Sequence, residues 1–201
     1  MTSETLARPG RRSERTRPTR RDREGAFDFD PHRCFACGEL NEQGLHLAIH
    51  TDPNGAWTET TLEPRFQGWE AVAHGGIVCT LLDEVMAWSV IGRGTWGVTA
   101  RLNVAFRRPI PVSRAIRAEG WVMDENRRGH RTGGRVLDAD TGEVLATADG
   151  MFIAVPPDEV KRLKARYGMR RPEQGGTSEP TEREDDPRGR RGPQPARSGA
   201  R

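Results

Sequence analysis

The longest regular pattern of apolar residues lies between Gly75 and Gly92, in a stretch without proline. Its apolar residues recur with the i, i+1, i+4 spacing that places side chains on one broad face of a helix. These residues are Ile77, Val78, Leu81, Leu82, Val85 and Met86. The pattern predicts one long buried helix bracketed by glycines.

A pattern of period two precedes this stretch. Residues 45–49 alternate between apolar and less apolar side chains, which is typical of a half-buried strand. Residues 52–55, Asp-Pro-Asn-Gly, form a turn signal. Residues 57–63 are therefore expected to return as the second strand of a hairpin, which ends at Pro64.

Four longer strands are predicted after the helix, over residues 98–107, 115–123, 131–139 and 144–155. Proline, glycine and asparagine mark the turns between them. A short charged helix is predicted at Pro157–Tyr167. One long helix followed by a meander of antiparallel strands is an α+β layout, with the sheet wrapped around the helix.

The two ends of the chain differ in composition from this central region. Residues 1–24 carry eight arginines and four acidic residues, and residues 168–201 carry eight arginines and six acidic residues. Segments with so few apolar side chains cannot bury a core. Both ends are expected to be disordered tails that flank one domain of residues 25–167.

The net charge of +3 comes from these tails. The central region holds 16 basic and 19 acidic side chains, which gives it a net charge of −3. A nucleic-acid-binding domain carries its positive charge on its folded surface, so no specific nucleic-acid partner is expected.

No segment predicts export or a membrane partner. The first 25 residues lack the apolar region of a secretory signal, and the apolar stretch 77–91 is too short for a bilayer and contains two acidic residues. We therefore expect a cytoplasmic protein, in which Cys34, Cys37 and Cys79 remain reduced.

The predicted start of the long helix offers groups that suit a developing oxyanion. Gly75 and Gly76 allow close approach of a ligand, and the first N–H groups of a helix have no acceptor within it. Asp83 follows seven residues after Gly76, near the same face of the helix. An acid within an apolar helix suggests a catalytic role, and the alternative is that Asp83 and Glu84 form a solvated stripe.

Two neighbouring residues have alternative interpretations. His74 is a candidate general base because histidine titrates near neutral pH. The alternative is that it fixes the turn, because a positive imidazolium is disfavoured before a helix N-terminus. Cys79 is a candidate nucleophile, but no basic neighbour in sequence favours a thiolate, so we expect it to pack.

These residues resemble the signature of the PaaI-type hotdog-fold acyl-CoA thioesterases. The resemblance rests on residues 66–68 (Phe-Gln-Gly), on residues 74–76 (His-Gly-Gly) and on residues 82–84 (Leu-Asp-Glu), where the Asp comes nine positions after the His. Residues 34–38, 44–45, 99–109 and 142–148 are also similar to recurrent segments of this group. The resemblance therefore covers residues 33–156.

The resemblance implies a hotdog fold, acyl-CoA as substrate and no cofactor. It implies a homodimer or a dimer of dimers, joined through sheet edges, with the active site at the interface. Asp83 would act as general base on water or as nucleophile, and Thr99 would orient the water. Gly75, with Gly76 beside it, would polarise the thioester carbonyl.

One position departs from the family pattern. Some members carry an asparagine six residues before the histidine, where this chain has Gly68. The neighbouring Gln67 is the candidate replacement, and both residues are expected at the substrate.

Helix geometry independently favours a dimer. Gly75 and Asp83 are eight residues apart, which is about 12 Å along a helix, yet both must come within about 3 Å of one thioester. If both are catalytic, each site takes its glycine from one protomer and its aspartate from the other.

Other residues have both a binding and a structural interpretation. The tryptophans at positions 57, 69, 88 and 96 line an acyl pocket or belong to the core, and Trp88 is the one assigned to the substrate. Arg107 and Arg108 hold coenzyme A phosphates at the pocket mouth or are solvated surface residues.

Cys34, Cys37, His46 and His50 have the composition of a zinc finger. The spacing is short, however, and the histidines lie on a predicted strand where a finger needs a helix. We therefore expect free thiols in a cap on the sheet, and no metal.

The sequence thus predicts an acyl-CoA thioesterase. Two alternatives are a noncatalytic hotdog module that binds an acyl-CoA or a protein, and a zinc-dependent nucleic-acid-binding protein.

Overall fold

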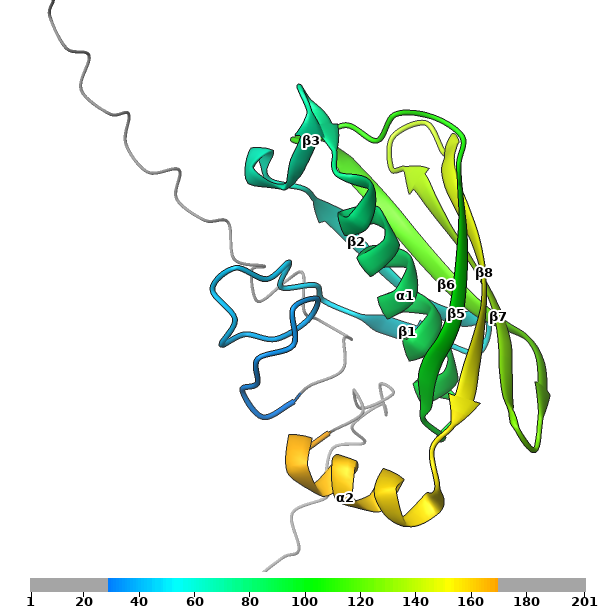
Figure 1. Ribbon diagram of the computed structural model, residues 1–201. Coiled ribbons are helices and arrows are strands. Elements are labelled where there is room, and N and C mark those ends of the chain that lie inside the picture. The colour runs from blue at the N-terminus through cyan, green and yellow to red at the C-terminus, as the bar shows by residue number, and fades with distance from the viewer. Residues whose placement is uncertain (1–28, 170–201) are drawn as a thin grey trace, which may run out of the picture.

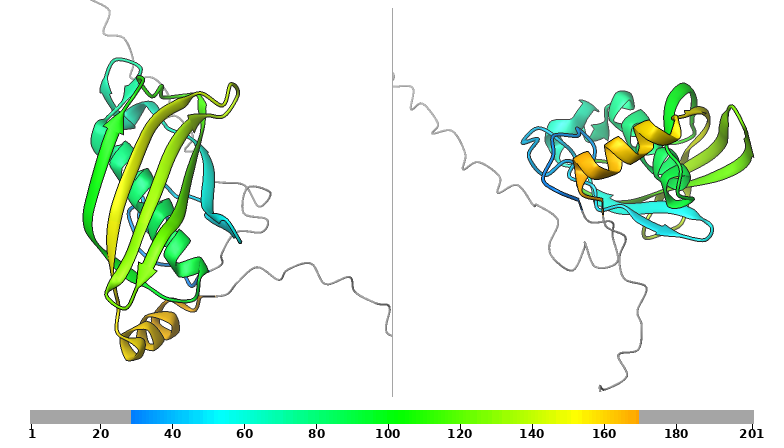
Figure 2. Two further views of the ribbon diagram at one scale, coloured as in Figure 1. Left: turned by 90° about the vertical axis from the view of Figure 1, so that its right-hand side faces the viewer. Right: turned by 90° about the horizontal axis from the view of Figure 1, so that it is seen from below.

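The computed structural model describes residues 29–169. An antiparallel sheet curves around one long helix (Figures 1 and 2), which is the α+β hotdog layout expected from the sequence. The predicted tails lie outside the described residues, apart from Gly168 and Met169, which follow the last helix.

The long helix, α1, spans Gly75–Gly92, the range that the apolar pattern predicts. Its buried residues are Val78, Leu81, Leu82, Val85, Met86, Trp88, Ser89 and Val90. By length and composition α1 could cross a membrane. Because the sheet wraps it and its apolar residues form the centre of the core, α1 is the central helix of a folded domain.

Six strands form the main sheet, and every neighbouring pair is antiparallel. In spatial order they are β1 His50–Asp52, β2 Gly55–Thr61, β6 Ala115–Asn126, β7 Gly129–Asp138, β8 Val144–Ala154 and β5 Gly97–Phe106. The predicted meander is confirmed for β6, β7 and β8. It is wrong for β5, which pairs with β8 and forms the edge of the sheet, while β2 lies beside β6.

The strand predicted over residues 45–49 is also wrong. Burial does alternate there, since Leu47 and Ile49 are buried, but β1 begins only at His50. His46 has a φ of 53°, which lies outside the strand region. The Leu47 N–H bonds to the carbonyl of Ala36, so this segment is an extended loop held by the preceding one.

A glycine allows α1 to lie close against the sheet. A Cβ atom at Gly120 on β6 would lie 2.5 Å from the backbone carbonyl of Val85 on α1. The helix and the sheet then enclose a core in which Ile116, Val136 and Phe152 are fully buried.

Short elements position the two ends of the domain. A 3-10 helix at Pro64–Phe66 and the ribbon of β3, Gln67–Trp69, with β4, Val72–Ala73, lead directly into α1. The second helix, α2, spans Pro157–Tyr167 as predicted. Residues 29–49 lie along the side of α1 away from β5 and β8 (Figures 1 and 2).

Candidate active site

Asp83 lies half-buried on the face of α1 that meets the edge strand β5. The Thr99 hydroxyl donates a hydrogen bond of 2.7 Å to Asp83 Oδ1. The β5–β8 register shifts between Thr99 and Arg101, so Ala100 is the extra residue of a bulge. Bulges re-aim side chains beside functional sites. The structure therefore joins the two residues that the sequence predicted, through a bulge that no sequence pattern indicated.

The N-terminus of α1 offers one unpartnered donor. His74 is the N-cap, and its Nδ1 accepts the Gly76 N–H at 3.0 Å. The Gly76 N–H is therefore already used, and the Nδ1 lone pair of His74 serves the cap. Across residues 29–169 the Gly75 N–H has no acceptor. Of the two glycines, Gly75 is the one free to polarise a carbonyl.

Gln67 and Gly68 lie beside this helix start. The Gln67 side-chain oxygen accepts the Ala71 N–H at 3.3 Å and so closes the β3–β4 turn. A Cβ at Gly68 would lie 3.1 Å from the Cα of His74. Gly68 therefore allows close approach of the ribbon to the N-cap, while the amide nitrogen of Gln67 has no hydrogen-bond acceptor within residues 29–169.

Within one chain the structure does not bring Gly75 and Asp83 together. Strand β5 runs beside α1 with its last residue, Phe106, next to Gly75, while Thr99 near its start contacts Asp83. The two groups are about 12 Å apart along the helix axis. Within one chain, Gly75 and Asp83 are therefore too far apart to act on the same thioester.

The predicted phosphate-binding arginines follow the Phe106 end of β5. The backbone N–H groups of Arg107 and Arg108 both bond to the carbonyl of Leu145. The Arg108 side chain pairs with Glu143 at 3.0 Å. The exposed Arg107 side chain has no acceptor among residues 29–169, so it is the more available cation.

The structure does not bring Trp88 to the Asp83 group. Trp88 is buried, its ring meets Phe29 edge-on at 5.0 Å, and its Nε1–H donates to Glu84 Oε1 at 2.9 Å. Of the other predicted tryptophans, Trp96 stacks on Tyr167 with ring centroids 6.4 Å apart. Trp57 stacks on His50, and Trp69 is 84% exposed.

Glu84 points away from its neighbour Asp83, towards the segment before β1. Burial raises the pKa of Glu84 to about 7. The hydrogen bond from Cys37 lowers the pKa of the Cys34 thiol to about 5. One ligand atom from each of Cys34, Cys37 and Glu84 lies within 4.8 Å of the others. The alternative of a solvated stripe therefore does not hold for Glu84.

The zinc-finger set of Cys34, Cys37, His46 and His50, which the sequence spacing disfavours, is not assembled, because His46 and His50 lie outside this group. Burial and the nearby charge of Asp83 raise the pKa of the Cys79 thiol. Cys79 is therefore not activated as a nucleophile, which agrees with the expectation from its sequence context.

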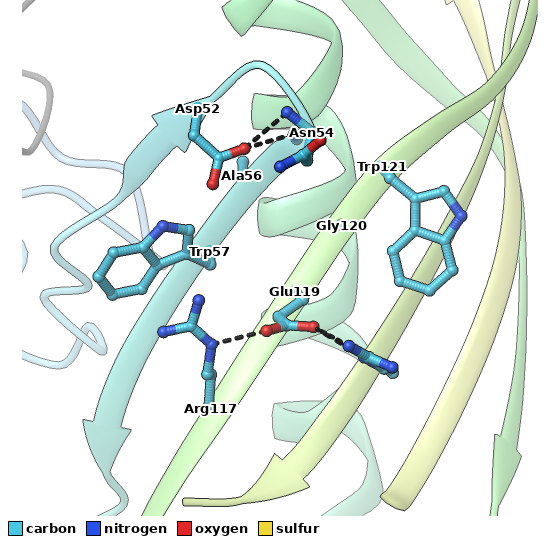
Figure 3. Close-up of a pocket in the computed structure, with 10 residues that line it drawn as sticks. Asp52, Asn54, Ala56, Trp57, Arg117, Glu119, Gly120 and Trp121 are labelled. Carbon is cyan, nitrogen blue, oxygen red and sulfur yellow. Dashed lines mark hydrogen bonds and ion pairs between the residues drawn. The ribbon is translucent and has the colours of Figure 1, made fainter. Parts of the chain in front are cut away.

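A hollow of about 370 Å³ lies on the outer face of the sheet, over β2, β6 and β7 (Figure 3). Trp57 and Trp121 lie on its two sides. The Glu119 carboxylate in it accepts from Arg117 at 2.6 Å and from Arg135 at 2.7 Å. The hollow is at the opposite edge of the sheet from β5, and its arginines are already paired, so it does not extend the Asp83 site.

Residues 70–145 match the family model of the thioesterase superfamily. Over 98 residues the chain is 28% identical to acyl-coenzyme A thioesterase THEM4 of Bos taurus, covering 48% of this chain and 39% of that protein. The chain therefore spans less than half the length of this curated relative.

Solved structures share the fold. A crystal structure of a thioesterase superfamily protein aligns with a TM-score of 0.57 and 26% identity, covering 60% of this chain and 63% of that one. Zebra fish thioesterase superfamily member 2 aligns with a TM-score of 0.54 and 15% identity, covering 59% and 90%. A hypothetical thioesterase protein with coenzyme A from Streptococcus pneumoniae gives 0.51 and 18%, covering 54% and 85%. Residues 70–145 are therefore similar in sequence to the thioesterase superfamily, and the solved structures share the hotdog fold of this chain.

Proposed function

We propose that this protein is an acyl-CoA thioesterase of the PaaI type, which hydrolyses the thioester at Asp83. The observation that carries the proposal is the Thr99–Asp83 hydrogen bond beside the free edge of the sheet. The family match and the similarity to the acyl-coenzyme A thioesterase THEM4 support it.

In the proposed reaction Asp83 acts as a general base. Its carboxylate takes a proton from a water molecule, and the water oxygen attacks the thioester carbonyl carbon. The Thr99 hydroxyl fixes one carboxylate oxygen, which leaves the other for the water. The tetrahedral intermediate then expels the coenzyme A thiolate, which takes up a proton, and releases the free acid. Because a thiolate is a good leaving group, no strong general acid is needed.

The oxyanion of that intermediate is bound by the partner's Gly75. Strand β5 ends the sheet with unpaired backbone groups, and Val98 and Phe106 on it are 64% and 53% exposed. A two-fold axis between Leu102 and Asn103, near the middle of β5, would place Thr99 opposite the partner's Phe106. Since Phe106 lies next to Gly75 and Thr99 next to Asp83, this pairing completes two sites at once.

Arg107 is the residue that we expect to bind the phosphates of coenzyme A. Arg107 follows Phe106 at the Gly75 end of β5, and its guanidinium has no acceptor in the described part of the chain. A guanidinium at this position binds a phosphate group in the fork geometry that arginine favours.

Thiol release from a panel of short-, medium- and long-chain acyl-CoAs tests the proposal. Asp83→Asn should lower kcat by roughly 10²–10⁴, the range of general-base catalysis. Thr99→Val should lower it by about tenfold, because one hydrogen bond to a charged group is lost. Asp149→Asn, at an exposed acid on the outer face of β8, is the matched control and should retain full activity. A wild-type chain that hydrolyses none of the panel would refute the proposed activity.

A further inference from the structure

Four residues that the proposed reaction does not use gather where the segment before β1 meets α1. The thiols of Cys34 and Cys37 and the carboxylate of Glu84 have ligand atoms within 4.8 Å of one another, and all three residues are half-buried. His32 Nε2 lies 3.6 Å from the Cys37 Sγ. We propose that His32, Cys34, Cys37 and Glu84 bind one zinc ion that fastens the segment before β1 to α1.

The spacing of these groups suits a tetrahedral ion. With zinc–sulfur bonds of about 2.3 Å and zinc–nitrogen bonds of about 2.0 Å, the ligand atoms around zinc lie about 3.3–3.8 Å apart. The distance of 3.6 Å between His32 Nε2 and Cys37 Sγ already has this value. The ligand atoms of Cys34, Cys37 and Glu84 lie within 4.8 Å of one another, so small side-chain shifts would bring these three to one ion.

Two further contacts prepare the ligands for a metal. His32 Nδ1 is 3.2 Å from the carbonyl oxygen of Asp30. A carbonyl can only accept, so Nδ1 carries the proton and the Nε2 lone pair points into the cluster. Glu84 Oε1 accepts the Trp88 Nε1–H at 2.9 Å, which fixes the carboxylate. Metal ligands are held by outer hydrogen bonds of this kind.

Charge also favours a bound cation. Two thiols and a carboxylate meet here, yet no ion pair within residues 29–169 includes Glu84. Zinc binding deprotonates its thiol ligands, and the ion supplies the charge that thiolates and a carboxylate withdrawn from water require. Two sulfur ligands with one nitrogen and one oxygen favour zinc over magnesium or calcium, which prefer oxygen ligands alone.

The proposed site has a structural role. Four protein ligands leave no open position for water, so the ion would not take part in hydrolysis. It would join two parts of the chain about 50 residues apart, at the residue next to Asp83. The proposal departs from the expectation of no metal, which rested on His46 and His50 as the only histidine ligands. His50 instead stacks on Trp57, with ring centroids 4.2 Å apart.

The test uses the full chain, reduced and stripped with a chelator, and titrated with zinc in competition with a chromophoric chelator. The expected result is one zinc per chain. Cobalt(II) added in place of zinc should give the strong sulfur-to-cobalt absorption that thiolate ligands produce. A stripped, folded wild-type chain that takes up far less than one zinc and shows no such absorption would overturn the proposal.

Matched variants test the ligand set. His32→Gln, Cys37→Ser and Glu84→Gln should each weaken zinc binding by more than the roughly 100-fold that loss of an outer contact can cost. Glu84→Gln is the sharpest, because its amide oxygen still accepts from Trp88 while the charge is lost. Cys79→Ser and His50→Gln are the controls and should bind zinc like the wild type. Zinc binding that survives in all three ligand variants, or that is lost in His50→Gln, would overturn the assignment.

Discussion

Replacing Gly75 by proline tests whether its N–H binds the oxyanion. The structure indicates that this replacement removes the N–H without disturbing the fold. Gly75 is the first residue of α1, where proline is favoured because the missing N–H has no helical acceptor. His74 before it has φ −62° and ψ 135°, the extended conformation that a residue preceding proline adopts. A Cβ at Gly75 would lie 3.4 Å from the end of the Phe106 ring, which can shift. The variant therefore loses one donor and keeps its fold.

The expected loss follows from that single donor. Removing one oxyanion donor lowers kcat by roughly 10²–10³, or about 3–4 kcal/mol of transition-state stabilisation. Asp83→Asn is expected to lower kcat by roughly 10²–10⁴. Each variant alone is thus nearly inactive, for a different reason.

Mixing the two variants then tests whether Gly75 and Asp83 of one site come from different chains. A dimer with one chain of each kind has one site with both changes and one site with neither, because each site takes Gly75 and Asp83 from different chains. Random exchange makes half of the dimers mixed, so thiol release should recover to about a quarter of the wild-type rate. Circular dichroism and light scattering check that both variants fold and form dimers.

If both groups came from one chain, every site in the mixed dimer would carry one change. Activity would then stay at the level of the single variants. That outcome, with subunit exchange demonstrated by differently tagged chains, would refute the proposed site between protomers, while wild-type hydrolysis would still support the thioesterase activity.

Three further predictions concern binding and stability. Arg107→Ala should raise the KM for acyl-CoA about tenfold but leave the KM for an acyl-pantetheine without the nucleotide phosphates unchanged; an equal rise for both would contradict a phosphate contact. Gly120→Ala should lower the free energy of unfolding in urea by about 3 kcal/mol or prevent folding, because the new Cβ would lie 2.5 Å from the Val85 backbone; a stable variant would mean that helix and sheet can separate. The backbone N–H of Thr141, and to a lesser extent its hydroxyl, donate hydrogen bonds that lower the pKa of Asp138 below its ordinary value of 3.8. The Asp138 carboxylate therefore stabilises the fold above about pH 4, and this stabilisation is lost as the pH falls through the folded-state pKa. Asp138→Asn should therefore cost more stability near pH 7 than near pH 3, and equal urea midpoint shifts at the two pH values would contradict this.

The sequence alone determined the elements whose signals are local. The apolar spacing between Gly75 and Gly92 gave the bounds of α1, and the period of two with its turn residues placed the four long strands within three residues of their bounds. These patterns reflect the pitch of a helix and the alternation of a strand, which depend on neighbours only a few positions apart. Asp83 stood out for the same reason, as an acid in an apolar helix.

Only the tertiary structure decided what depends on distant parts of the chain. No short sequence pattern predicts that β5 lies beside β8 or that a bulge turns Thr99 towards Asp83. Nor does any such pattern predict the positive φ of His46, which is incompatible with the strand expected over residues 45–49. Glu84 differs from Asp83 by one position, yet the 100° step of the helix sends one carboxylate to β5 and the other to Cys34 and Cys37. Which residues meet across such distances is set by how the sheet closes on the helix, because packing, unlike periodicity, couples residues that are far apart in sequence.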